Sequence, residues 1–261
     1  KILAMIFSYS IFSIGFLLPV IQLLYWNVLS RGGPLKETLY YTFTSFLTSG
    51  GASAIILIGA IIIAGTVRMS SNIIGNIIGR ITILGYSIPG AVVAIGVLLF
   101  ILQLDSFIVL METLIGIKID LVLSNTIIVL IFAYTVRFMG ISFNSVNSGY
   151  EKIGESYFEA ARTLGKNATS AFFKIDLPML KPALLSGYLL VFIEVMKELP
   201  LTLILRPFNF DTLATKAFKY ASDEMIYRAA DFSIVLILLL AMAIYFITHQ
   251  KRGENNATSN K

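Results

Sequence analysis

The 261-residue sequence contains no cysteine and a single histidine, His249. Disulfide-stapled folds, Cys/His zinc sites, thiol nucleophiles and paired-histidine haem ligation are therefore excluded. Charged residues make up only 13% of the chain, about half of the roughly 25% that is usual in soluble domains. These absences argue against a redox or zinc enzyme, and we expect no cofactor and no resident metal ion.

Apolar residues are abundant instead. They make up 57% of the sequence, and the mean hydropathy is +0.83. A globular core of this size could not hide so much apolar surface, so the chain must be surrounded by lipid. The net charge of +5 could indicate a nucleic-acid partner. We favour membrane insertion as its cause, because membrane proteins collect lysine and arginine on their cytoplasmic side.

Charge-poor apolar runs predict an all-α integral membrane fold, with six transmembrane helices in one domain over residues 1–248. A helix rising about 1.5 Å per residue needs about 20 residues to cross the hydrocarbon layer. Flanking apolar residues extend the shorter runs, and Arg137 is expected to snorkel to the interface. The expected spans are about 3–26, 45–67, 81–102, 119–138, 182–205 and 232–248.

The basic residues are distributed unequally between alternate loops. One side of the predicted membrane carries twelve of the 20 lysines and arginines and five of the 15 carboxylates, so its net charge is +7 against −2 for the rest. By the positive-inside rule both termini are cytoplasmic, with a polar tail at 249–261. Two long hydrophilic loops follow, 150–181 inside and 206–231 outside. The chain begins with lysine rather than methionine, so we expect an upstream segment.

The cytoplasmic loop contains two short predicted helices. Residues 155–164 are good helix formers, and Gly165 stands where a C-terminal cap would end the first helix. Asn167 can cap the second helix. Because Pro178 lacks the amide hydrogen that a continuing helix needs, we expect the second helix to stop there.

The second of these helices is amphipathic, with Ala168, Ala171 and Phe172 on one face. Phe172 and Phe173 form an aromatic pair between two lysines in a solvent-facing loop. Burying this pair requires either a groove on a partner protein or the lipid headgroups, and both interpretations fit the pattern.

The same loop carries a spaced motif. Glu159-Ala160-Ala161 is followed after three residues by Gly165 and after nine more by Ile175-Asp176-Leu177-Pro178, which resembles the EAA loop of ABC-importer permeases. The resemblance implies a type I importer permease (MetI-like) fold in a bacterial inner membrane. It also implies that the loop docks on a separate ABC ATPase subunit. The residues of this coupling loop would be Glu159, Ala160, Ala161, Gly165, Phe172, Phe173, Ile175, Leu177 and Pro178.

Further segments look like the ferric-iron branch of these permeases: residues 86–90, Tyr-Ser-Ile-Pro-Gly, with 94–96, residues 134–138 and, above all, residues 198–214. That branch fuses two halves in one chain, and this sequence resembles the C-terminal half. The resemblance implies ferric iron as substrate, a periplasmic solute-binding protein, and a second permease half that is fused upstream or separate. Only residues 198–214 favour iron over thiamine, sulfate, polyamines or aminophosphonates, which permeases with the same loop also carry.

The fifth predicted span contains the only ionisable cluster expected inside the membrane, Glu194, Lys197 and Glu198. Spacings of three and four make Glu194 a neighbour of both other residues. Intramembrane charges commonly mark a pathway, so we interpret the cluster, with Arg206, as a candidate translocation path or gate. The alternative is an ion pair that locks this helix to another. Two carboxylates fall short of a hard-metal coordination shell, so we predict no tight iron site.

The sequence of the outer loop predicts one or two short amphipathic helices between Asp211 and Asp231. By the resemblance, this face receives the periplasmic binding protein, and the candidate contacts are Asp211, Thr212 and Tyr220. A lid packed on its own permease is the alternative that the pattern equally allows.

Three function classes fit this composition. A transporter permease subunit needs no catalysis of its own, and the absence of a G-x-x-x-x-G-K-[ST] motif assigns ATP hydrolysis to a partner. A membrane-embedded transferase could use Glu194 and Glu198 as acid and base. Against it, the sequence has no nucleophile motif and no histidine or cysteine at membrane depth. A channel would need a filter-like run, which is absent, so we predict a permease subunit rather than an enzyme.

Overall fold

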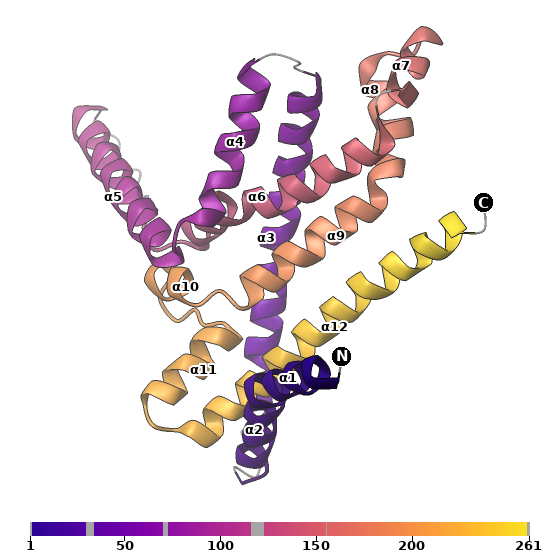
Figure 1. Cartoon of the computed structure of the whole chain (residues 1–261). Coiled ribbons are helices and arrows are strands. Elements are labelled where there is room, and N and C mark those ends of the chain that lie inside the picture. The colour runs from indigo at the N-terminus through magenta and orange to yellow at the C-terminus, as the bar shows by residue number, and fades with distance from the viewer. Residues whose placement is uncertain (1, 30–33, 70–72, 116–122, 155, 260–261) are drawn as a thin grey trace. The chain divides into compact units, whose positions relative to one another are not determined.

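The computed structural model describes residues 2–29, 34–69, 73–115, 123–154 and 156–259. Within these ranges all regular structure is helical, without a strand (Figure 1). The first residues of the predicted fourth span, 119–122, and the side chains of the predicted tail from residue 250 lie outside the described part.

Six helical stretches in the described ranges are long and apolar enough to cross a membrane, which confirms the predicted fold class and number of spans. They are Ile2–Leu29, Leu35–Arg68, Gly90–Ile115, Ile127–Ile153, Ala168–Met196 and Ile226–His249. The elements that compose the chain are α1 (Ile2–Phe12), the π turn η1 (Ser13–Leu17), α2 (Leu18–Leu29), α3 (Leu35–Met69), α4 (Ile73–Ser87), α5 (Gly90–Ile115), α6 (Ile127–Ile153), α7 (Ser156–Thr163), α8 (Ala168–Ala171), the π turn η2 (Phe172–Asp176), α9 (Leu177–Met196), α10 (Pro200–Leu205), α11 (Leu213–Ser222) and α12 (Ile226–Ser259).

The chain divides into two compact units. The first contains residues 1–47 and 210–242, and the second contains residues 48–209 and 243–261. In the second unit α6 packs against α9 on one side and α4 on another, and α10 contacts α5. Its core joins side chains of α3, α6 and α9, namely Ala60, Ala64, Phe143, Val146, Tyr150 and Leu180.

Two predicted spans are interrupted, and both breaks occur at prolines. The predicted third span, 81–102, is divided because α4 ends at Ser87 and α5 begins at Gly90. Pro89 disfavours helix at the preceding residue, and its carbonyl accepts the first amide hydrogen bonds of α5, from Val92 and Val93. The predicted fifth span, 182–205, is likewise divided. Its helix ends at Met196, and Pro200 opens the separate helix α10, since proline suits a first helical turn.

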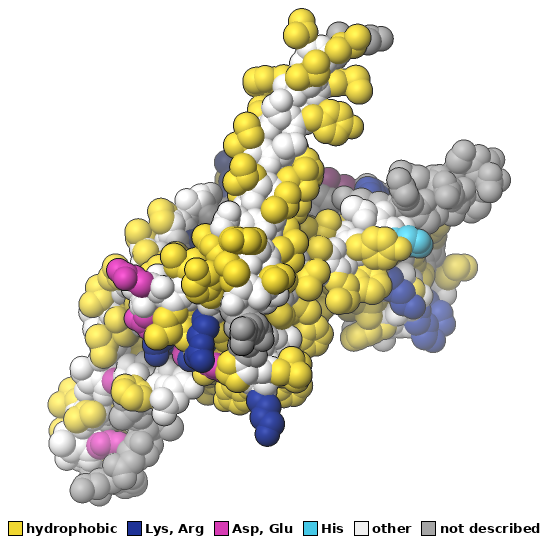
Figure 2. Space-filling view, turned by 90° about the horizontal axis from the view of Figure 1, so that it is seen from below, with side chains coloured by type: hydrophobic (Ala, Val, Ile, Leu, Met, Phe, Trp, Pro, Cys, Tyr) yellow, Lys and Arg dark blue, Asp and Glu magenta, His cyan; other side chains and the backbone are white. Residues whose placement is uncertain are grey.

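The described surface is strongly apolar. No residue of α1, η1 or α2 is buried in the chain, and large hydrophobic side chains are exposed along most of the long helices. Figure 2 shows hydrophobic side chains over most of one face, with Lys, Arg, Asp and Glu in small groups. Lipid is the surrounding medium that accommodates such a surface.

Glycine allows close contact between α4 and α6. A Cβ atom added at Gly85 would overlap the carbonyl oxygen of Val136. In the Gly85→Ala variant the backbone of α4 or of α6 must therefore shift. We expect this overpacking to cost about 1–3 kcal/mol, which thermal unfolding in detergent would detect as a lower melting temperature. The matched control is Gly96→Ala in α5, where an added Cβ meets nothing within 4 Å. Equal melting temperatures for the two variants would contradict this packing.

Candidate functional site

The turn after α7 has the geometry that the sequence predicts. Gly165 has a φ of +80°, its N–H donates to the carbonyl of Arg162, and the N–H of Lys166 donates to the carbonyl of Ala161. These two hydrogen bonds form a Schellman cap. A left-handed residue with a Cβ is strained by about 1–2 kcal/mol, so glycine is the residue that fits this position.

The second helix of the loop begins as predicted but does not end as predicted. Asn167 caps it, since its Oδ1 accepts the N–H of Ser170 at 2.8 Å. Pro178 does not stop it, because α8 continues through the π turn η2 directly into α9. In that turn the N–H of Leu177 donates to the carbonyl of Phe172, five residues earlier. Pro178 then lies in the first turn of α9, where its missing N–H is tolerated.

The coupling-loop residues separate into an inner and an outer group. Ala161 and Ala171 are buried, and Ala168 and Phe172 are half-buried on the predicted apolar face. Ile175 and Leu177 are also half-buried. The outer group, exposed to a potential partner, comprises Glu159, Ala160, Gly165, Phe173 and Pro178 from the motif, together with Tyr157 and Leu164. These last two were not predicted from the sequence, although an exposed apolar side chain beside a helix cap indicates a possible contact.

The cluster at the end of α9 contains two different ion pairs. Lys197 Nζ lies 2.8 Å from Glu194 Oε1, and the Lys197 side chain is half exposed. Glu198 is buried, and its Oε2 lies 3.4 Å from Arg137 Nε in α6. The other Glu198 oxygen accepts the N–H of Leu201 at 3.2 Å. Glu198 therefore both pairs with α6 and caps the start of α10.

Arg137 does not snorkel to the interface, which corrects the sequence prediction. Its guanidinium pairs with Glu198 and donates to the carbonyl of Ile88 at 2.6 Å. A buried carboxylate needs a charged or hydrogen-bonding partner, and the helix break at Pro89 leaves the Ile88 carbonyl available as an acceptor. Gly90 makes room for the pair, because a Cβ there would lie 2.5 Å from Glu198 Oε1.

The same junction contains a second polar contact. Thr202 Oγ1 donates to the carbonyl of Glu198 at 2.8 Å and lies 2.6 Å from the hydroxyl of Tyr134, which is fully buried. Arg206 follows as the C-cap of α10, and its N–H donates to the carbonyl of Thr202. The junction thus connects α6 and α10 through side chains of the segment that resembles the iron branch.

A cleft of about 770 Å³ lies among α4, α6 and α9 in the second unit. Its polar lining comes largely from one stripe of α6, Asn144, Ser145, Ser148 and Lys152, with Ser186 of α9. The four candidate pathway residues are not part of this lining. The stripe was not predicted from the sequence, although polar residues spaced three to four apart in an apolar helix indicate a polar face.

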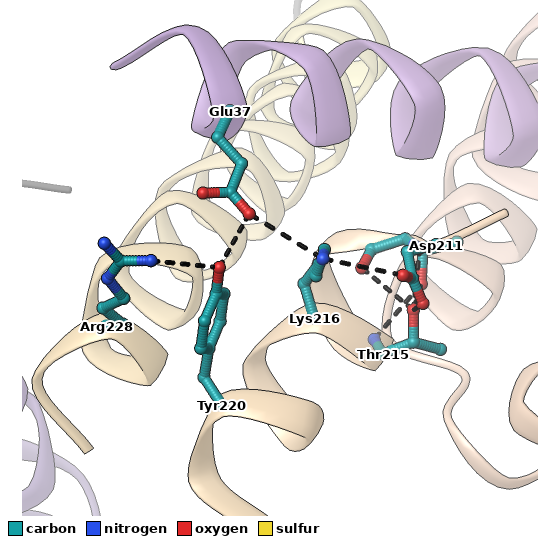
Figure 3. Close-up of polar contacts among 7 residues, drawn as sticks. Glu37, Asp211, Thr215, Lys216, Tyr220 and Arg228 are labelled. Carbon is teal, nitrogen blue, oxygen red and sulfur yellow. Dashed lines mark hydrogen bonds and ion pairs between the residues drawn. The ribbon is translucent and has the colours of Figure 1, made fainter. Parts of the chain in front are cut away.

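The candidate outer contacts belong to a network in the first unit (Figure 3). Glu37 Oε1 accepts the hydroxyl of Tyr220 at 2.7 Å and lies 3.7 Å from Lys216 Nζ. Lys216 Nζ also lies 3.8 Å from Asp211 Oδ2, and Arg228 donates to the Tyr220 hydroxyl at 3.4 Å. Burial and then the hydrogen bond to Glu37 raise the pKa of Tyr220, so the phenol stays protonated.

Thr212 has a structural role as the N-cap of α11. Its side chain is buried and accepts the N–H of Thr215, forming a capping box at the start of α11. Glu37 and Lys216 were not candidates from the sequence, because they are 179 positions apart and no local pattern joins them. The network attaches α11 to the first turns of α3.

The sequence matches, over residues 55–251, the family described as binding-protein-dependent transport system inner membrane component. The chain belongs to this family. It is a multi-pass inner membrane protein, and the family places it among transporter permeases rather than enzymes.

Named relatives of this permease include iron transport proteins. It is 25% identical over 246 residues to Fe(3+)-transport system permease protein FbpB 2 of Haemophilus influenzae, a match that covers 92% of this chain and 46% of that protein. It is 36% identical over 70 residues to the molybdate/tungstate transport system permease protein WtpB of Methanocaldococcus jannaschii, covering 26% and 28% of the two chains. This permease thus spans about half the length of FbpB 2.

Solved structures share the fold. A bacterial alginate ABC transporter in complex with an alginate-pentasaccharide-bound periplasmic protein superposes with a TM-score of 0.67 at 16% identity, covering 96% of this chain and 93% of that chain. The MetNI methionine ABC transporter superposes with a TM-score of 0.57 at 14% identity, covering 84% and 99%. At these identities the likeness establishes the ABC-importer permease fold alone.

Proposed function

We propose that this chain is the membrane-spanning permease of an ATP-driven importer of ferric iron. The observation that carries a transport role is the cleft among α4, α6 and α9, which places hydroxyl, amide and ammonium groups between membrane helices. Polar side chains gathered between apolar helices are typical of a substrate pathway. The likeness to a Fe(3+)-transport permease over 92% of this chain supports iron as the substrate.

The proposal assigns three partners. An ABC ATPase docks on the outer group of the coupling loop, a second permease half, fused or separate, completes the pathway, and a periplasmic binding protein delivers iron. The ATPase contact is supported by exposed Phe173 and Leu164, which are 59% and 82% accessible beside the rigid Gly165 turn. In this arrangement the coupling loop and both termini are cytoplasmic, with loop 206–231 outside.

The binding protein would contact the outer network and the exposed end of α11. Asp211 and Tyr220 are half-buried and hold the network together. They would therefore affect the binding-protein contact partly by fixing the shape of this surface. Thr212 acts from inside, as the helix cap. Exposed Phe218, Lys219 and Arg228 complete the proposed contact surface.

The ion pairs have separate roles in this proposal. The Glu194–Lys197 pair, in which only the Lys197 side chain is half exposed, remains the candidate gate, with Arg206 one helix further along. The buried Arg137–Glu198 pair fixes the junction of α6 with α10, which was the alternative interpretation of the cluster. Neither pair provides enough oxygen ligands to retain iron.

A second candidate substrate is an oxyanion. The relative named for molybdate and tungstate supports it, as does Lys152, the one charged side chain among the described residues that line the cleft. Ammonium groups bind oxyanions as point charges. A single uptake experiment distinguishes this substrate from iron.

The experiment uses proteoliposomes that contain the permease complex, with ATP inside and the binding protein outside. We expect uptake of radioactive ferric iron that requires both ATP and the binding protein, and no uptake of radioactive molybdate. Filling the cleft in the Ser148→Trp variant should lower uptake about tenfold or more, as expected for a blocked binding pocket. Ser106→Trp, at an exposed position of α5, is the matched control. Molybdate uptake without iron uptake would overturn the iron assignment.

A further inference from the structure

One arginine contacts both ends of the coupling loop. Arg68, in the last turn of α3, donates from Nη2 to the carbonyl of Gly154 at 2.7 Å. Its Nη1 lies 3.3 Å from Asp176 Oδ1. Gly154 directly follows α6, and Asp176 is the last residue of η2. A single guanidinium therefore closes the segment 154–176, which contains α7 and α8.

The surroundings of this contact are dry and aromatic. The side chains of Arg68 and Asp176 are 12% and 4% accessible. The Arg68 guanidinium lies 4.6 Å from the ring centre of Tyr150 in α6 and 5.7 Å from that of Phe158 in α7. A planar, weakly hydrated guanidinium can stack on rings while two separate nitrogens reach two different acceptors, whereas lysine carries all its donors on one nitrogen.

The position of Arg68 connects the loop to the membrane helices. One and two turns before Arg68, Ala64 and Ala60 of α3 are fully buried against α6 and α9. Displacement of the loop therefore acts on α3 through the guanidinium and on α6 and α9 through the backbone. Replacing a buried ion pair with apolar residues of similar volume is often neutral for stability, so stability alone does not explain this pair.

We propose that Arg68 is a positioning residue that holds the coupling loop rigidly on α3, so that ATP-driven movement of the loop is converted into movement of the membrane helices. This inference rests on the proposed coupling of the loop to an ATPase. Without the Arg68 contacts the loop still binds the ATPase through its exposed residues, but ATP hydrolysis is transmitted poorly to transport.

The main test is the double variant Arg68→Met/Asp176→Leu, which removes both charges and leaves neither unpaired. In the reconstituted complex, the ATPase should co-purify as with the wild type. The number of ATP molecules hydrolysed per iron imported should rise about tenfold, the effect of about 1.4 kcal/mol of lost coupling. Arg80→Met, at an exposed arginine of α4, should leave this ratio unchanged.

A second variant keeps the test independent of folding. Arg68→Lys retains the charge opposite Asp176 and loses the two-way contact, so it should fold and raise the ratio about threefold. A wild-type ratio in the lysine variant or the double variant would overturn the role of Arg68. Failure of the wild-type permease to bring down an ATPase is a different result, because it would overturn the proposed coupling itself.

Discussion

Replacing Arg137 by alanine is expected to remove most of the folded permease from detergent extracts. The variant leaves the Glu198 carboxylate buried without its cation, and it removes the donor to the Ile88 carbonyl. Breaking one partner of a buried ion pair costs about 3–5 kcal/mol. Folded domains are stabilised by only about 5–15 kcal/mol, so the loss should appear as aggregation in size-exclusion chromatography and as a lower melting temperature.

The neighbouring ion pair provides the matched control. Glu194→Ala removes the partner of Lys197, whose side chain is 49% accessible and, as part of the proposed gate, can be hydrated by the water of the pathway. Such a pair contributes less than about 1 kcal/mol, so the variant should melt close to the wild type. A double variant, Arg137→Met/Glu198→Leu, should recover most of the folded protein, because neither charge is left unpaired. Equal melting temperatures for Arg137→Ala and Glu194→Ala would show that the buried pair does not hold the junction.

Local features of the coupling loop could be predicted from sequence because their interactions span few residues. The Gly165 cap joins groups within five positions of one another, and the Asn167 cap joins groups three positions apart. Proline was less predictable. Pro89 interrupts a span that was predicted to be continuous, whereas Pro178, where a stop was predicted, follows a π turn and lies inside a continuing helix. A π turn has no simple sequence signature.

Long-range pairs could not be predicted, since they depend on which helix faces meet. Arg137 follows an apolar run, which predicted that its side chain would extend to the membrane interface. Its partner Glu198 lies 61 positions further along the chain, so no local pattern indicated the pair. The same holds for Arg68 with Asp176. The polar stripe of α6 could be recognised from its spacing in the sequence. The cleft could not, because it forms only where α4 and α9 pack on either side of that stripe.

The largest effect on assembly is expected from the exposed aromatic side of the coupling loop. Phe173→Asp removes a ring that is 59% accessible and rigidly placed at the π turn η2. Aromatic anchors at the centre of an interface contribute about 2 kcal/mol or more, so the ATPase should dissociate about 30-fold more readily. Co-purification of the ATPase with tagged permease measures this loss. Because Phe173 contributes little to the core of the chain, the variant should otherwise fold normally.

Phe208→Asp is the matched control, since Phe208 is 92% accessible and lies in the loop between α10 and α11. That loop is proposed to face the periplasm, so the control should retain the ATPase and change only the response to the binding protein. The opposite pattern, with the ATPase lost in Phe208→Asp and kept in Phe173→Asp, would reverse the proposed orientation. Because the positive-inside rule and the coupling motif both place residues 150–181 in the cytoplasm, that one result would contradict both arguments at once.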